Sequence, residues 1–163
     1  MPATREMLFR RLEDLAIATT TVSHPPVFTV EEARVLRGAI PGAHIKNLFL
    51  KDKKAVLWLV VCLEDAAIDL KALPAVIGSA RLSFGRPELL REVLGIEPGS
   101  VTPFALINDR QRRVNVILDA RILAADRVNC HPLENTATTT IATGDLMAFI
   151  ASTGHVPKIV DFT

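Results

Sequence analysis

Two apolar runs, His44-Ile-Lys-Asn-Leu-Phe-Leu-Lys51 and Ala55-Val-Leu-Trp-Leu-Val-Val-Cys-Leu63, decide the fold of this chain. Only Asp52, Lys53 and Lys54 separate them, so the pattern predicts the two strands of a β-hairpin. The second run is apolar on both faces, which is typical of a central strand covered on both sides. The hairpin is therefore expected to form the centre of a sheet against which the other segments pack.

Periodicity, caps and turn residues predict the elements outward from this hairpin. Helices are expected over residues 5–18, 30–37 after a capping box at 29–32, 70–76, 87–94 between Pro87 and Gly95, and 145–152 after a cap at Thr143. Strands are expected over residues 81–84, 104–107, 114–118, 128–131, 136–142 and 156–160, with 108–113 as the turn of a second hairpin. Strands and helices without strict alternation indicate the α+β class and a mixed sheet, in a single domain over residues 1–163.

Composition excludes several classes of protein. Of the 163 residues, 49% are hydrophobic, which favours a globular core over disorder, and no apolar run reaches the roughly 20 residues of a membrane helix. The N-terminus has no uninterrupted apolar signal core, so a soluble cytoplasmic protein is expected. A net charge of +1 argues against a general nucleic-acid binder, and seven Phe, one Trp and no Tyr argue against a broad base-stacking platform.

The two cysteines, Cys62 and Cys130, are expected to be reduced thiols, with Cys62 in the core. Cys130 precedes His131, a pairing that raises the question of a metal site. Zinc sites need three or four converging ligands, and the chain has no CxxC or HExxH spacing. No zinc site is therefore predicted.

Lys46 is unusual because it interrupts a strand that is otherwise mostly apolar. Alternation along a strand places Lys46 with His44 and Leu48 on one face, and Asn47 with the opposite face. An edge-strand lysine that discourages aggregation is one interpretation, and composition alone favours it. The other is a fixed cation in a pocket, where it holds a phosphate or the carbonyl region of a substrate.

The segment Gly99-Ser100-Val101-Thr102-Pro103 is a rigid loop after a helix. Gly99 permits backbone conformations that other residues avoid, and Pro103 stiffens the far end. Such a loop can direct several N–H groups toward an anion or carbonyl. A simple turn between two elements explains the same pattern.

His131-Pro132 is the third candidate, because histidine can act as acid, base or hydrogen-bond donor near neutral pH. A structural histidine at a strand end is equally compatible with the sequence. No GxSxG motif supports a serine nucleophile. The basic cluster 110–113 is expected at a hairpin tip, where it is either solvated or touches a nucleic-acid backbone.

Taken in order, these motifs resemble the YbaK/ProX superfamily of aminoacyl-tRNA editing domains. The resemblance rests on Lys46-Asn47, on the loop from Gly99 to Pro103, and on His131-Pro132-x-x-Asn135-Thr-Ala-Thr-Thr139. The segments 82–94, 101–109 and 153–161 are similar to the ProX-type alanyl-editing branch. The resemblance covers essentially the whole chain.

The resemblance implies a mixed, partly barrel-like sheet flanked by helices, and hydrolysis of Ala-tRNA that carries a proline anticodon. It implies that Lys46 and His131 are the catalytic residues, with Lys46 near the terminal nucleotide and ester and with His131 positioning water or substrate. It also implies that no metal and no organic cofactor take part. Substrate-binding residues would be Asn47, the loop residues Gly99, Ser100, Val101, Thr102 and Pro103, and two pocket-wall residues, Val30 and Ala33. The implied partner is the aminoacylated acceptor end of tRNA, with prolyl-tRNA synthetase or an elongation factor as candidate protein partners and no membrane or specific DNA.

Three alternatives remain at the level of sequence. A relative of YbaK type would remove cysteine from the same tRNA, and pocket volume would decide between the two substrates. A nucleic-acid-binding or regulatory module without catalysis is a different class, for which near-neutral charge predicts weak binding to duplex DNA. The third is a domain that works only when docked on a synthetase.

Overall fold

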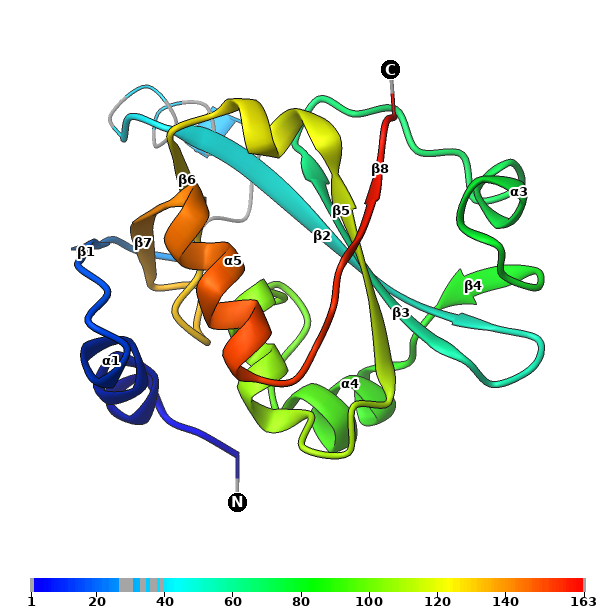
Figure 1. Cartoon of the computed structure of the whole chain (residues 1–163), viewed down its shortest axis with the longest axis horizontal. Coiled ribbons are helices and arrows are strands. Elements are labelled where there is room, and N and C mark those ends of the chain that lie inside the picture. Colours follow the sequence, from blue (N-terminus) through cyan, green and yellow to red (C-terminus); the bar gives the residue numbers. More distant parts are fainter. Residues whose placement is uncertain (1, 27–30, 33–34, 36–37, 39, 163) are drawn as a thin grey trace.

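The computed structural model describes residues 2–26, 31–32, 35, 38 and 40–162 (Figure 1). Its helices are α1 (Arg5–Asp14), α3 (Leu73–Ile77), α4 (Pro87–Leu94), α5 (Thr143–Ser152) and the 3₁₀-helices η1 (Pro103–Asn108) and η2 (Ala120–Ala124). Its strands are β1 (Thr19–Ser23), β2 (Ala43–Asp52), β3 (Leu57–Leu63), β4 (Leu82–Phe84), β5 (Val114–Asp119), β6 (Arg127–Cys130), β7 (Ala137–Ala142) and β8 (Lys158–Val160). The predicted helix over 30–37 lies largely outside the described residues.

The strands form one mixed sheet of eight strands, in the order β1-β7-β6-β2-β3-β5-β8, with β4 paired to β2. The central hairpin is confirmed, since β2 and β3 run antiparallel with Lys46 opposite Cys62. β2 pairs in parallel with β6 at its start and antiparallel with β4 at its end. It therefore belongs to both halves of the sheet and crosses the molecule in Figure 1. The α+β class and the mixed sheet flanked by helices are confirmed.

The sheet separates two apolar clusters, and alternation along each strand assigns side chains to one or the other. Phe49 of β2 belongs to the larger cluster, which α1, α4 and α5 cover. Leu50 belongs to the smaller cluster, which includes Leu73 and Ile77 of α3. Burying an apolar side chain of this size contributes about 1.5–3 kcal/mol, so both faces of β2 are held firmly. The alternation also sends Lys46 and Asn47 to opposite faces of the sheet, as predicted.

The predicted strand over 104–107 is wrong, because these residues form η1 instead. Pro103 fixes the first helical position, and the Thr102 hydroxyl accepts a hydrogen bond from the Phe104 N–H at 3.3 Å. A short apolar run does not distinguish a buried strand from a buried helical turn by periodicity. The predicted second hairpin is also wrong, because its first strand is η1 in the structure. β5 pairs in parallel with β3 and β8 instead.

Several helix boundaries also differ from prediction. α1 ends at Asp14, and Ala16 adopts a positive φ of 58° just beyond it. Thr143 is the first residue of α5 and makes no cap; its hydroxyl donates to the Ala125 carbonyl at 2.6 Å. Within the described part of the chain, no helix is long and apolar enough to cross a membrane.

Candidate active site

The candidate site lies beside a stretch of β2 that has a strand partner on one side only. β2 pairs with β6 at Ala43 and His44, and with β4 from Leu50 onward. Between these points, residues 45–49 pair with β3, and no described strand pairs with their other edge. The two halves of the sheet thus separate along the middle of β2, which leaves room for a loop and a turn from elsewhere in the chain.

Asn47 connects this stretch to the loop 99–103. Its Nδ2 donates to the Val101 carbonyl at 3.1 Å. Its Oδ1 is buried and has no hydrogen-bond partner among the described residues. Buried polar atoms in folded proteins are almost always paired, so this oxygen is a vacant acceptor at the site.

The loop is fixed at both ends. Gly99 has a φ of +90°, a backbone conformation that residues other than glycine rarely adopt. The Ser100 N–H donates to the Glu97 carbonyl at 3.0 Å. At the other end, Thr102 caps η1 and is fully buried. A Cβ at Gly99 would lie 3.7 Å from Nδ2 of Asn135, so the loop also approaches the turn that follows β6.

His131 begins that turn, directly after β6. Its Nδ1 lies 3.1 Å from the Ala137 carbonyl. A carbonyl only accepts, so Nδ1 carries the proton in the neutral ring and Nε2 keeps its lone pair. Burial lowers the pKa of His131 below 6.5, and the neighbouring His24 lowers it further, although the hydrogen bond to Ala137 opposes both. His131 is therefore neutral at pH 7.

His24 also lies at this site, although no sequence motif marked it as a candidate. Its Nε2 lies 2.8 Å from the Thr138 hydroxyl, and its backbone N–H donates to the Thr136 carbonyl at 2.9 Å. The only signal in the sequence is its position before Pro25-Pro26. Its proximity to His131 depends on the pairing of β1 with β7, which no local pattern reveals.

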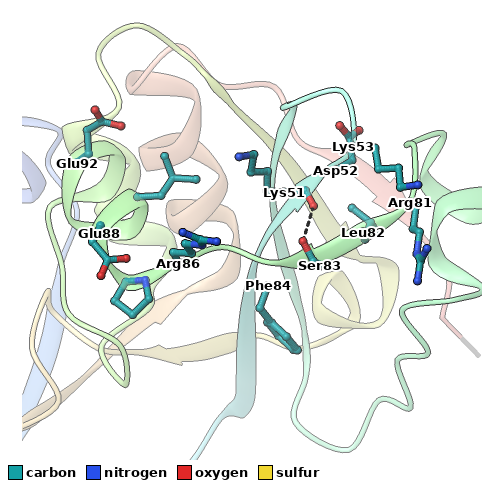
Figure 2. A pocket seen from close by; sticks show the side chains of 12 residues that line it. Lys51, Asp52, Lys53, Arg81, Leu82, Ser83, Phe84, Arg86, Glu88 and Glu92 are labelled. Carbon is teal, nitrogen blue, oxygen red and sulfur yellow. Dashed lines mark hydrogen bonds between the residues drawn. The ribbon is translucent and has the colours of Figure 1, made fainter.

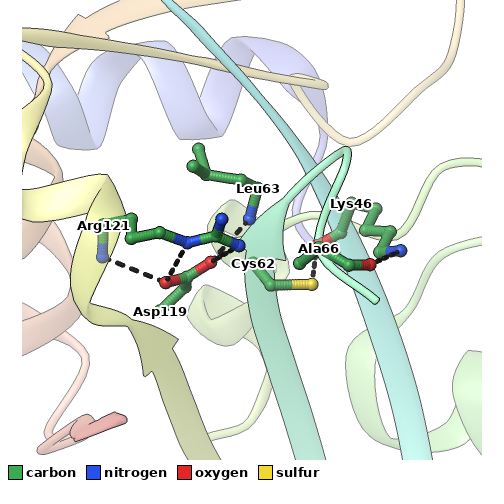
Figure 3. Close-up of polar contacts among 6 residues, drawn as sticks. All are labelled: Lys46, Cys62, Leu63, Ala66, Asp119 and Arg121. Carbon is green, nitrogen blue, oxygen red and sulfur yellow. Dashed lines mark hydrogen bonds and ion pairs between the residues drawn. The ribbon is translucent and has the colours of Figure 1, made fainter. Parts of the chain in front are cut away.

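Lys46 lies on the face of β2 opposite to Asn47, close to Cys62 and Ala66 (Figure 3). Its Nζ donates to the carbonyl of Ala66, after β3. Beside it, the Cys62 thiol donates weakly to the Lys46 carbonyl at 3.8 Å. Among the described residues, no hydrogen bond joins Lys46 to the other predicted site residues.

Asp119 and Arg121 stabilise the end of β3, which lies next to the part of β2 that carries Lys46. The two side chains form an ion pair at 3.1 Å, and Asp119 also accepts from the Leu63 N–H at 3.1 Å. Burial would raise the pKa of Asp119, but the hydrogen bonds from Arg121 and Leu63 outweigh it and lower the pKa. Asp119 therefore stays ionised and fixes the end of β3 next to Cys62.

Neither cysteine is suited to nucleophilic chemistry. Burial raises the pKa of Cys62 to about 11, although Lys46 opposes the shift, and burial also raises the pKa of Cys130. Both thiols stay protonated at neutral pH, and only the thiolate is a good nucleophile. Within the described ranges, no group of three His, Cys, Asp or Glu side chains could hold a metal ion.

The remaining predicted residues fall elsewhere. Val30 and Ala33 lie outside the described residues. The basic cluster 110–113 lies between η1 and β5 rather than at a hairpin tip. Arg113 pairs with Glu92 at 3.6 Å, which leaves Arg110 and Arg112 exposed in this loop.

The structure thus combines a single mixed sheet with a loop and a histidine turn that lie next to its central strand. Residues 24–149 match the family model of the aminoacyl-tRNA editing domain, and the chain belongs to that family. Within it, the chain is related to the ProX-type prolyl-tRNA editing proteins.

Individual relatives support this placement. The prolyl-tRNA editing protein ProX of Acetoanaerobium sticklandii is 34% identical over 158 residues, covering 96% of this chain and 96% of the relative. The prolyl-tRNA synthetase associated domain-containing protein 1 of Danio rerio is 39% identical over 160 residues, covering 97% and 87%. A crystal structure described as a proposed trans-editing enzyme for prolyl tRNA synthetase shares the fold, with a TM-score of 0.71, 21% identity and 99% coverage of both chains.

Proposed function

We propose that this chain is a trans-editing deacylase that hydrolyses the ester of Ala-tRNA(Pro). The observation that carries the proposal is the convergence of Asn47, the loop 99–103 and the His131 turn at the open side of β2. These segments are far apart in sequence, and together they offer a vacant acceptor, backbone N–H groups and a neutral imidazole. Membership of the editing family and similarity to a ProX protein support the same activity.

The chemistry needs a positioned water and donors for the charge that develops on the ester oxygen. In the proposed reaction, the water oxygen bonds to the carbonyl carbon and the bond to the ribose oxygen breaks. Nε2 of His131 orients the water and takes its proton, which is then returned to the ribose oxygen that leaves. N–H groups of the loop 99–103 stabilise the oxyanion, and Oδ1 of Asn47 accepts from the substrate's ammonium group.

Lys46 enters the proposal as the cation that holds the terminal nucleotide. Its Nζ donates to the Ala66 carbonyl, and because an ammonium group has three donors, it can also donate to a substrate phosphate. A cation is the side chain suited to a phosphate or a polarised ester. We assign Lys46 to nucleotide binding and leave proton transfer to His131.

Selection of alanine over proline follows from size. A proline site in a synthetase cannot exclude the smaller alanine, because each missing methylene changes binding by only about 1–3 kcal/mol. A second, smaller pocket can admit alanine and exclude proline. We include Val30 and Ala33 in the walls of that pocket.

The test compares hydrolysis of Ala-, Cys- and Pro-tRNA(Pro) by the unmodified chain and by Lys46→Ala, with Lys71→Ala as a control that removes an exposed lysine elsewhere. We expect rapid loss of alanine alone, abolished by Lys46→Ala and unchanged in the control. Faster loss of cysteine would move the protein to the cysteine-specific branch. Hydrolysis of none of the three would refute the proposed activity.

A further inference from the structure

A cationic surface, separate from the candidate active site, lies at the outer end of β2. It is an open groove of about 1130 Å³ between the β2–β4 pair and α4 (Figure 2). Four exposed cations line it: Lys51, Lys53, Arg81 and Arg86. We call these four residues and the space beside them the basic groove.

The cations of the basic groove are free to bind an anion. Among the described residues, none of the four forms an ion pair. Lys51 lies opposite Ser83 in the β2–β4 ladder, and Lys53 is bonded through its backbone to Arg81 at 3.0 Å. In Figure 2 Lys51 extends toward α4, whereas Lys53 and Arg81 lie together on the other side of the ladder, and Arg86 follows two residues after β4. Four exposed cations without an ion pair to a described residue thus line one groove of a chain whose net charge is +1.

Three acidic residues also line the basic groove, and two of them bind other groups. Asp52 is 5% exposed and accepts hydrogen bonds from the N–H groups of Lys54, Val56 and Ala80. Glu92 pairs with Arg113, outside the groove. Glu88 remains, on the α4 side and opposite the ladder that carries most of the cations (Figure 2). The ladder side of the groove therefore presents positive charge to solvent.

The basic groove lies along β2 on the same face as Asn47 of the candidate active site. Asn47 and Lys51 are four residues apart on β2, so they share one face, and a rise of about 3.3 Å per residue separates them by roughly 13 Å. On the other wall, α4 leads from Arg86 to Gly95 and then to the loop 99–103. A polymer whose end occupies the active site would therefore meet these cations a short distance away.

From this geometry we infer that the basic groove binds the sugar-phosphate backbone of the RNA arm whose end enters the active site. The inference rests on the proposed function for the identity of that end. Phosphates spaced along a strand match cations spaced along a ladder, and such contacts set register without reading sequence. Phe84, which is 63% exposed at the same groove, adds a ring on which an unpaired base can stack.

The test measures binding of uncharged tRNA(Pro) at several salt concentrations. Lys51→Ala/Arg86→Ala removes two groove cations, and Arg10→Ala/Lys71→Ala removes two exposed cations outside the groove. Each phosphate contact contributes about 0.7–0.9 to the slope of log K against log salt, so the groove variant should lower the slope by about 1.5 and bind roughly tenfold more weakly at 0.1 M salt. The control should keep the slope of the unmodified chain.

A second measurement separates this inference from the proposed function. A short alanyl-oligonucleotide ester ends before the groove, so the groove variant should hydrolyse it at the unmodified rate. If the groove variant kept the full salt slope, or the Arg10/Lys71 control lost it instead, the groove assignment would be wrong while the deacylase proposal stood. A groove-dependent slope without hydrolysis of either substrate would leave the groove standing and remove the deacylase. Equal affinity for duplex DNA of the same length would show unspecific polyanion binding and overturn the RNA assignment.

Discussion

At the scale of single residues, the site depends on protonation states that the fold imposes. His131 is held with its Nδ1 proton on the Ala137 carbonyl, so the same hydrogen bond orients the ring and presents the lone pair of Nε2. A histidine that is partly buried beside another histidine loses its proton more readily than one in water. The sequence singled out His131 and Asn47 as candidates, and strand alternation placed Asn47 on the face opposite to Lys46. It missed His24, because that contact arises only when β1 pairs with β7.

The pH dependence of hydrolysis follows from the lowered pKa of His131. The neutral ring is the active form, so kcat/KM should be full at pH 7 and should fall only when the pH drops below 6.5, the ordinary histidine value. His24→Asn removes a charge that lowers this pKa, and the acid limb should move to higher pH. His131→Ala should lower kcat/KM by about 10²-fold or more and remove the acid limb. An acid limb that persisted in His131→Ala would assign the titration to another group.

Gly85 tests close packing at the end of β4. A Cβ at this position would lie 2.4 Å from the Phe49 ring, which is buried in the larger cluster. Overpacking of this kind costs about 1–3 kcal/mol, so Gly85→Ala should lower the free energy of unfolding by that amount in urea. Gly144→Ala in α5 meets no atom within 4 Å and should leave stability unchanged or raise it by up to about 1 kcal/mol. Equal stabilities of the two variants would show that the contact with Phe49 relaxes at no cost.

At the scale of elements, the central hairpin was predictable because its signal is local. Two apolar runs with a three-residue connection determine both strands and their antiparallel pairing. The run 104–107 was not predictable in the same way. Phe104, Ala105 and Leu106 are all buried, and Phe104 packs edge-to-face on Phe149 with ring centroids 5.3 Å apart. Full burial removes the periodicity that separates a strand from a helical turn.

Asp109 provides a prediction for the connection between η1 and β5. Its carboxylate accepts from the N–H groups of Arg113 and Val114 at 3.0 and 2.8 Å, and from the buried His155 ring at 2.8 Å. Asp109→Ala leaves these donors without a partner, so it should lower the free energy of unfolding by about 3 kcal/mol or more. Arg110→Ala, one residue further on the surface, should change it by no more than about 0.5 kcal/mol. Similar effects of the two substitutions in thermal or urea unfolding would mean that the turn holds without Asp109.

At the scale of the whole molecule, the middle and the outer end of β2 contribute to different sites. The middle of the strand supplies Asn47 to the candidate site, and the outer end supplies Lys51 to the basic groove. Neither the separation of the sheet at residues 45–49 nor the approach of Gly99 to Asn135 could be inferred from sequence, because both depend on long-range pairing. The family resemblance placed the motifs in order, and the fold shows how they meet.

The most direct test of the central claim is the single-turnover rate of alanine release from Ala-tRNA(Pro), measured for the unmodified chain and for Asn47→Ala. The account predicts fast release by the unmodified chain. It also predicts a loss of about 10²-fold in the variant, because Asn47 both holds the loop 99–103 and offers the vacant acceptor. Pro-tRNA(Pro) should stay intact with both proteins. Alanine release at the same rate by Asn47→Ala, with the fold preserved, would contradict the proposed site.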